Sequence, residues 1–246
     1  MTNNDLSKAD SNGADEGPDA AEPATDPQPA TTRRLWPNSD ETVELIAEVQ
    51  NGDGGARNNL LERHRDALRR MIDMRLDRRI RGRVDASDIV QDVLVTANRR
   101  LNDFLDKPDV PFFIWLRKLA QDRVIDAHRK HRASAKRSVD REQAWTFQVN
   151  NDESTILLAN QLRDDGITPA AAATLEEFRN HFESALNSMD DTDREIIVMR
   201  HYEFMTNKQV ATALELSEHA ASMRYVRALR KVGKLLRKEG FDQNED

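Results

Sequence analysis

Residues 112–132 read FFIWLRKLAQDRVIDAHRKHR, with three aromatic residues in four positions directly before a run of cations. Apolar residues recur three and four positions apart through this stretch, which predicts one amphipathic helix. Trp115 projects about 100° away from Leu116 around a helix and is the better candidate for stacking on a ligand. Arg123 falls among the apolar residues, so we expect it to need an acidic partner or a bound phosphate. The apolar face is expected to pack in a core and includes Phe112, Phe113 and Leu116.

Helical spacing continues on the N-terminal side of this stretch. A helix is expected from near Ser39 to the turn at residues 51–55, because clustered Asn, Asp and Gly break helices. Asp85 has the chemistry of an N-cap for a second helix that runs to about Phe104. No strand-like alternation of useful length occurs anywhere in the chain. Residues 39–138 are therefore predicted to form a small bundle of helices.

The rest of the chain divides into three further segments. Residues 1–38 are rich in Asp, Ala, Pro and Thr and have almost no large apolar side chains, so they are predicted to be a disordered acidic extension. Residues 139–173 are acidic with little sustained periodicity, and they are predicted to be a linker with one short helix near residues 156–162. Residues 174–240 are predicted to form a second helical domain. The expected fold class is all-α, with two small helical domains joined by a linker.

Helix-start signals are frequent near and inside the second domain. Thr168 followed by proline predicts one helix N-terminus. Capping-box patterns open at Thr192, with Glu195 three residues later, and at Thr206, with Gln209 three residues later. Each of these boxes predicts the start of a helix.

Residues 206–214 and 218–236 have the build of a helix-turn-helix. A short helix, NKQVATAL, turns through ELS into a longer basic helix. In such a motif the second helix enters the major groove of DNA and presents its N-terminal residues to base edges. Spacing alone leaves open the alternative of an ordinary helical hairpin whose last helix is basic.

The net charge of −7 conceals two basic blocks. Residues 57–141 carry 22 Lys and Arg against 13 Asp and Glu, and residues 218–238 carry 7 against 1. Two basic blocks separated by an acidic one indicate two surfaces that contact a polyanion. Basic helices that are merely solvated are the alternative.

Several classes of function are disfavoured by what the sequence lacks. The chain has no cysteine, which excludes thiolate zinc sites and cysteine nucleophiles. Its histidines are scattered apart from His128 and His131, which lie in a basic stretch that disfavours a metal cation. No Gly-rich phosphate loop, signal peptide or apolar run of about 18 residues occurs. We therefore expect a cytoplasmic protein that is not an enzyme, uses no cofactor or metal and does not insert into a membrane.

Three stretches together resemble bacterial sigma factors. They are DASDIVQDVLVTANRRLNDF (85–104), the stretch at 112–132, and LNSMDDTDREIIVMRHYEFMTNKQVATALELSEHAASMRYVRALRKVGKLL (186–236). With two helical domains and no third domain between them, the chain is similar to the extracytoplasmic-function (ECF) group. The resemblance implies an initiation subunit that directs RNA polymerase to promoters, recognises the −10 and −35 elements and promotes DNA melting.

The resemblance also implies partners and positions. The partners would be core RNA polymerase, through its β′ clamp helices and β flap, promoter DNA, and a regulatory protein such as an anti-sigma factor. Binding of core polymerase is expected at Asp88, Gln91 and Asp92. Binding and melting of the −10 element are expected at Trp115, Arg117, Lys118, Asp126, Arg129, Lys130 and Arg132. Binding of the −35 element is expected at His219, Ser222, Arg224, Tyr225 and Arg227.

The chemistry of these residue types suits the implied task. An opened promoter offers unstacked bases, and each stack of a base on an aromatic ring is worth roughly 1–3 kcal/mol. Two rival functions stay open at this stage: a free-standing helix-turn-helix regulator that binds duplex DNA without polymerase, and a scaffold that binds only proteins. The aromatic and basic stretch at 112–132 and the outward polar residues near Asp88 favour the sigma factor.

Overall fold

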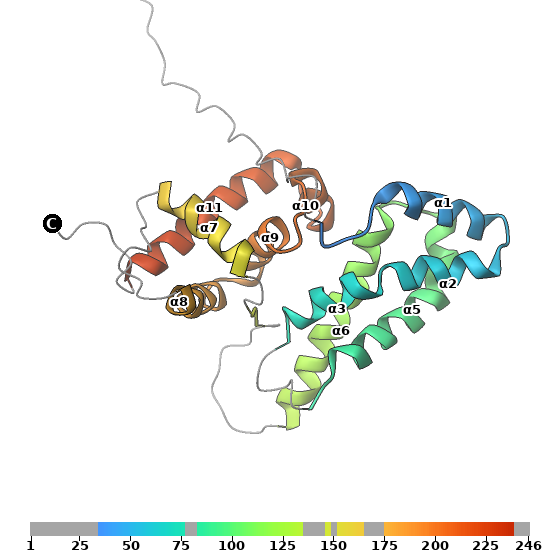
Figure 1. Cartoon of the computed structure of the whole chain (residues 1–246), viewed down its shortest axis with the longest axis horizontal. Helices are drawn as coiled ribbons and strands as arrows, with labels where there is room; N and C mark the ends of the chain where they lie inside the picture. The colour runs from blue at the N-terminus through green and yellow to red at the C-terminus, as the bar shows by residue number, and fades with distance from the viewer. Residues whose placement is uncertain (1–33, 77–82, 135–145, 149–151, 165–174, 239–246) are drawn as a thin grey trace, which may run out of the picture.

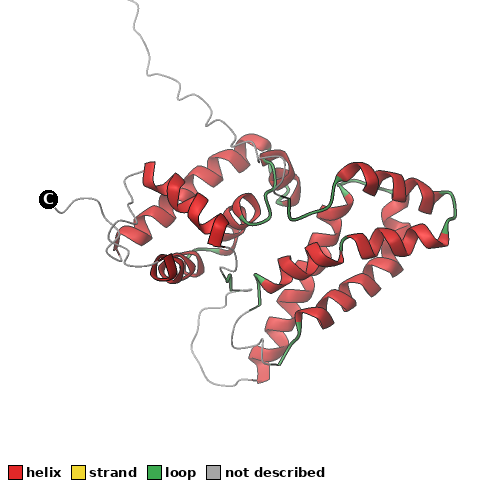
Figure 2. Ribbon diagram, viewed as in Figure 1, coloured by secondary structure: helices red, strands yellow, loops and turns green. Residues whose placement is uncertain are grey.

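The computed structural model describes residues 34–76, 83–134, 146–148, 152–164 and 175–238, and every regular element in these ranges is a helix (Figure 2). The predicted all-α class is therefore confirmed. The helices form two groups, one from α1 to α6 and one from α7 to α11 (Figure 1). Within the described ranges, no helix combines the length and the apolarity that crossing a bilayer requires.

The first domain is a bundle in which α5 packs against both α3 and α6, and α1 packs against α2. Asn38, Asp53 and Asp85 each accept a hydrogen bond from a backbone N–H of the first turn that follows, which fixes three helix starts. The helices are α1 (Ser39–Gln50), α2 (Gly54–Arg63), α3 (Arg65–Asp73), α5 (Ala86–Asp106) and α6 (Phe112–Ser134).

The core of this domain lies between α5 and α6. Residues four positions apart share one face of a helix, and these faces are fully buried at Val93, Ala97 and Leu101 of α5 and at Leu116, Ala120 and Val124 of α6. Arg123 does not join them: its side chain is exposed, and Nη2 donates to Thr96 Oγ1 at 3.0 Å. The expected place of Arg123 within the apolar face is therefore wrong, because a long side chain at the border of that face reaches water instead.

The second domain ends in the helix-turn-helix formed by α10 and α11. The capping box at Thr206 and Gln209 is confirmed, with both reciprocal hydrogen bonds present. Asn207 Nδ2 donates to the Glu218 carbonyl at 2.9 Å and ties the starts of the two helices together. The helices are α7 (Asp152–Asp164), α8 (Leu175–Ser188), α9 (Asp191–His201), α10 (Asn207–Ala213) and α11 (Glu218–Lys238).

The start of α9 differs from the prediction. Asp190 is the N-cap, and its carboxylate accepts from the Asp193 N–H at 3.0 Å. Thr192 therefore lies inside the helix, and Glu195 does not close a capping box but is buried. The predicted box is wrong because an aspartate two residues earlier supplies the cap first.

Two segment boundaries also differ from the prediction. Leu35 and Trp36 are buried, so the expected disordered extension does not reach residue 38; residues 1–33 lie outside the described residues. The linker helix α7 exceeds the predicted span of 156–162 at both ends. The helix start expected at Thr168 lies outside the described residues.

The two domains touch. Helix α10 packs against α6, and residues 146–148 contact both domains. Gln148 N donates to the Met74 carbonyl of the first domain at 2.8 Å. Asn187 Nδ2 of the second domain donates to the Phe147 carbonyl at 2.9 Å. The placement of α10 against α6 brings the helix-turn-helix next to the basic helix of the first domain.

Candidate polymerase and nucleic-acid interfaces

The outward face of α5 carries the residues expected to bind polymerase. Asp88, Gln91 and Asp92 are all exposed, because they lie on the side of the helix opposite its buried stripe. Val95, one turn further along, is 44% exposed. Val95 therefore gives this otherwise polar face a small apolar area beside its carboxylates.

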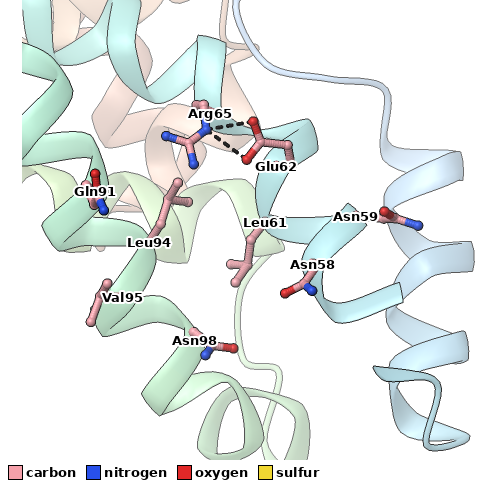
Figure 3. A pocket seen from close by; sticks show the side chains of 9 residues that line it. All are labelled: Asn58, Asn59, Leu61, Glu62, Arg65, Gln91, Leu94, Val95 and Asn98. Atoms are coloured by element: carbon pink, nitrogen blue, oxygen red, sulfur yellow. Dashed lines mark hydrogen bonds and ion pairs between the residues drawn. The ribbon is translucent and has the colours of Figure 1, made fainter. Parts of the chain in front are cut away.

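A surface pocket adjoins this face (Figure 3). It has a volume of about 460 Å³ and lies between α2 and α5. Leu94 and Val95 come from α5 and Leu61 from α2, while polar side chains surround them (Figure 3). Arg65 Nε donates to both carboxylate oxygens of Glu62 at 2.7 and 2.8 Å, which holds one side of the pocket in place. The lining residues are Asn58, Asn59, Leu61, Glu62, Arg65, Gln91, Leu94, Val95 and Asn98.

The aromatic residues at the start of α6 are packed among themselves. Trp115 is half-buried, and its ring stacks on Phe104 with the ring centroids 4.8 Å apart. Phe112 is buried, as predicted, whereas Phe113 is half-buried. The ring centroid of Phe113 lies 5.7 Å from that of Trp36. Trp115 therefore keeps some exposed surface, but its ring already has one stacking partner within the protein.

The cations expected along α6 fall into three groups. Arg129 and Lys130 are exposed, as is the neighbouring Asp126, and the side chain of Arg132 lies outside the described residues. Lys118 is exposed and donates to Glu215 Oε1 at 3.0 Å. Arg117 is buried and presents no surface that DNA could contact in this arrangement.

The start of α11 carries the residues expected to read duplex DNA. His219 is exposed. Arg224 Nε lies 3.8 Å from Asp193 Oδ1. With Ser222 and Arg227, these side chains lie at the N-terminal part of the second helix of the motif, where base contacts are made in helix-turn-helix proteins.

Tyr225 differs from its neighbours because it belongs to the core. It is buried, and its hydroxyl lies 2.8 Å from His201 Nε2. The guanidinium of Arg200 lies over its ring, 5.4 Å from the centroid. Burial, with a further effect of the Arg200 charge, lowers the pKa of His201 to about 3, so this histidine is neutral and joins α9 to α11.

Four charged side chains form an ion cluster that sequence reasoning did not find. Arg75 and Arg117 come from the first domain, and Glu195 and Glu203 from the second; each is at most 3% exposed. Arg75 Nη2 donates to Glu195 Oε1 at 2.8 Å and also to Glu203 Oε1. Arg117 donates through Nε to Glu203 Oε2 at 2.9 Å and through Nη2 to Glu195 Oε1.

Trp36 and His128 support this ion cluster from the first domain. Trp36 Nε1 donates to Glu203 Oε2 at 3.1 Å, and His128 Nε2 lies 3.0 Å from the Arg75 carbonyl. Burial by itself would raise the pKa of Glu203, but the charges of Arg117 and Arg75 outweigh it and hold this pKa at about 2. The cluster is therefore fully charged at neutral pH.

One signal in the sequence could have indicated that the segment before the first helix packs against the core. This signal is the pair of large apolar residues Leu35 and Trp36, which lie just before that helix.

Comparison with known proteins gives a consistent result. The sequence profile of the family described as ECF sigma factor matches residues 39–238. The RNA polymerase sigma factor CnrH of Cupriavidus metallidurans is 30% identical over 195 residues, which cover 78% of this chain and 92% of that protein.

A solved structure of CnrH supports the fold. The structure of CnrH in complex with the cytosolic domain of CnrY superposes with a TM-score of 0.50 at 25% identity, covering 82% of this chain and all of that one. A co-crystal structure of the sigma factor RpoE with the anti-sigma factor NepR from Bartonella quintana gives a TM-score of 0.43 at 18% identity, covering 73% of this chain and 96% of that chain.

Proposed function

Because the chain belongs to the ECF sigma factor family, we propose that it binds core RNA polymerase through the exposed face of α5 and directs it to promoters with matching −10 and −35 elements. Helix α6 would contact the −10 element and help to melt it, and α11 would read the −35 element as duplex DNA. The chemistry of RNA synthesis belongs to the polymerase, so this chain needs no catalytic residue of its own.

The face of α5 is the observation that carries the proposal. Asp88, Gln91 and Asp92 serve no purpose in the core of the first domain, because all three side chains are exposed. The partly apolar pocket beside them, with Val95 exposed at its edge, supplies the apolar centre and polar rim that protein interfaces use. The β′ clamp helices are the expected occupant of this face, and the β flap is expected to contact the second domain.

Two DNA-contacting surfaces support the same function. Arg129 and Lys130 on α6 are exposed cations, and with Arg227 on α11 they suit contact with phosphates. An arginine near the start of a recognition helix, such as Arg224, can also read guanine in the major groove. On α6, Trp115 is half-buried and offers part of its ring to an unstacked base.

A regulatory partner and a location complete the proposal. CnrH has been solved in complex with the cytosolic domain of CnrY, and by analogy we expect this chain to be restrained by a protein of the anti-sigma type. Since polymerase and promoters are in the cytoplasm of a bacterium, the protein is expected to act there.

Run-off transcription with purified core polymerase tests the proposal. The full chain should give transcripts from a matching promoter, and the variant Asp88→Ala/Gln91→Ala/Asp92→Ala should bind core polymerase more weakly. The free energy of unfolding should decrease by only about 0.5 kcal/mol per substituted surface site. The matched control is Asp103→Ala/Asp106→Ala. It also removes two negative charges, from exposed positions near the end of the same helix.

Three results would contradict the proposal. A triple variant that competes normally for core polymerase would exclude α5 as the docking face. No transcript with any promoter would argue against initiation. Tight and sequence-specific binding of the isolated chain to duplex DNA would favour a stand-alone regulator.

A further inference from the structure

Helix α11 carries one apolar side chain among its exposed residues. Met223 has 49% of its surface exposed. Every other exposed residue of this helix, which is described over its full length, is charged or polar; these are Glu218, His219, Arg227, Arg230, Lys234 and Lys238. A single apolar residue on a surface is common and has no meaning by itself. The position of Met223 on the helix gives it one.

Met223 lies at the centre of the side of α11 that faces away from the core. Successive residues of a helix are about 100° apart, so His219, Met223 and Arg227 project within about 80° of one another. Arg230 and Lys234 project between the same directions. The buried side chains point the opposite way, and they are Ala221, Tyr225, Ala228, Leu229, Val232 and Leu236. Met223 is therefore the apolar centre of an outer face that is otherwise cationic and polar.

Contacts near the start of α11 hold this face in position. Ser217 Oγ accepts from the Ala220 N–H at 3.1 Å, as the capping residue of a helix does. Arg227 Nε donates to the Met223 carbonyl at 3.3 Å, so this arginine runs back along the helix toward Met223. Arg224 projects about 100° to one side, where its Nε lies 3.8 Å from Asp193 Oδ1. The two arginines thus lie beside Met223 and leave its side chain half exposed.

We propose that Met223 determines part of the −35 specificity by contacting the C5-methyl group of a thymine in the major groove. This inference rests on the proposed function, in which α11 reads the −35 element as duplex DNA. The N-terminal part of the second helix of a helix-turn-helix lies against base edges, and Met223 belongs to the second turn of α11. The cations of the same face suit the phosphates that border the groove.

Thymine is the base whose chemistry fits this side chain. The major-groove edges of the base pairs present hydrogen-bond donors and acceptors, and the methyl group of thymine is the one apolar group among them. A methionine thioether has no hydrogen to donate. Over any other base edge it would displace water without replacing the hydrogen bonds of that water. Over a thymine methyl it removes apolar surface from water on both partners, and its flexible chain can adapt to the position of the methyl group.

Replacement of thymine by uracil tests the contact, because the two bases differ only by this methyl group. Holoenzyme assembled from core polymerase and the full chain first selects its −35 sequence from duplexes randomised at that element. Each thymine of the selected element is then replaced in turn by deoxyuridine. Burial of one methyl group is worth about a fourfold change in an equilibrium constant. We therefore expect about fourfold weaker binding for uracil at one position, and no difference between the two bases with Met223→Ala.

Two further variants control this measurement. Met223→Leu keeps an apolar side chain and should keep the preference for thymine over uracil. Leu157→Ala removes a similarly exposed apolar side chain, 45% exposed, from α7 of the same domain and should behave as the wild type. Thermal unfolding of all three variants should be unchanged, since both positions are exposed. The comparison of thymine with uracil in the wild type needs no variant and holds whatever their stability.

Any of three results would overturn the thymine contact. One is a selected −35 element without thymine, or wild-type holoenzyme that binds every uracil duplex as tightly as the thymine duplex. Another is Met223→Ala holoenzyme that keeps the full preference for thymine, which would assign the methyl group to a different residue. The third is weaker binding of Met223→Ala to core polymerase with an unchanged preference for thymine, which would place Met223 at a protein contact.

Failure of the proposed function would give a different pattern. If the holoenzyme selects no sequence but the free chain does, the uracil series is repeated with the free chain. A preference for thymine that Met223→Ala abolishes would then contradict the proposed function and leave the thymine contact standing. A chain that selects no sequence in either form would overturn both.

Discussion

At the scale of single residues, the buried side chain of His64 is expected to make the stability of the protein depend on pH. His64 is buried in the first domain, and its Nδ1 lies 3.0 Å from the Leu60 carbonyl. Burial, only partly offset by that hydrogen bond, lowers its pKa from 6.5 to about 4. At a pH between these two pKa values, the unfolded chain binds a proton on His64 that the folded chain does not. The free energy of unfolding must therefore decrease as the pH falls through this range.

The free energy of unfolding is expected to decrease by on the order of 3 kcal/mol for His64 between pH 7 and pH 4. Urea unfolding followed by circular dichroism at several pH values in this range measures the decrease. His64→Gln should flatten the slope, and His219→Gln, at an exposed position, should not. An unchanged slope in His64→Gln would show that other groups cause the acid sensitivity.

The hydroxyl of Tyr225 gives a second prediction for one residue. Tyr225→Phe keeps the buried ring but leaves His201 Nε2 without the partner now 2.8 Å away, which should cost about 1–2 kcal/mol of stability. The preference for −35 sequences should stay the same, since the ring is buried and does not reach DNA in this arrangement. Thermal unfolding and a −35 binding series on the holoenzyme measure the two quantities. A changed sequence preference at normal stability would assign Tyr225 to DNA contact after all.

At the scale of elements, α6 and α11 are predicted to act on different forms of DNA. An aromatic face can hold an unstacked base, whereas a guanidinium can bond base edges in a closed major groove. Trp115→Ala should therefore slow promoter opening. Arg224→Ala should change which −35 sequences are preferred, by about 1–3 kcal/mol per lost bidentate contact.

A template with a pre-melted −10 region separates these two effects. It should rescue Trp115→Ala if Trp115 nucleates melting, and it should not restore the −35 preference of Arg224→Ala. The stack of Trp115 on Phe104 makes a thermal melt of each variant necessary, because loss of the ring also removes packing. Normal opening rates in a stable Trp115→Ala protein would make the residue a packing element only.

At the scale of the whole molecule, the negative net charge and the contact between the two domains should limit DNA binding by the free chain. The net charge is −7, and the basic helix α6 faces the second domain along part of its length. We expect weak duplex binding that falls further as salt is added, and specific promoter binding only after core polymerase is present. Fluorescence anisotropy with a labelled promoter, with and without polymerase, measures both states. Equal affinity in the two conditions would contradict this prediction.

The sequence by itself determined the helices and the faces they bury. Helix starts at Asp85 and Thr206 and the buried stripes of α5 and α6 follow from spacing and capping chemistry, which act between residues at most a few positions apart. The same local rules predicted that Asp88, Gln91 and Asp92 would be exposed, because they lie opposite the stripe. The family resemblance came from the order of these local motifs.

Only the tertiary structure decided what each face packs against. Arg117 was expected at DNA but is buried against Glu195 and Glu203, which are 78 and 86 positions away in the chain. Trp36 meets Glu203 across 167 positions. A periodic pattern shows which side of a helix is apolar, but it contains no information on which distant segment covers that side. Local patterns therefore could not predict that two arginines of one domain and two carboxylates of the other meet in one buried cluster.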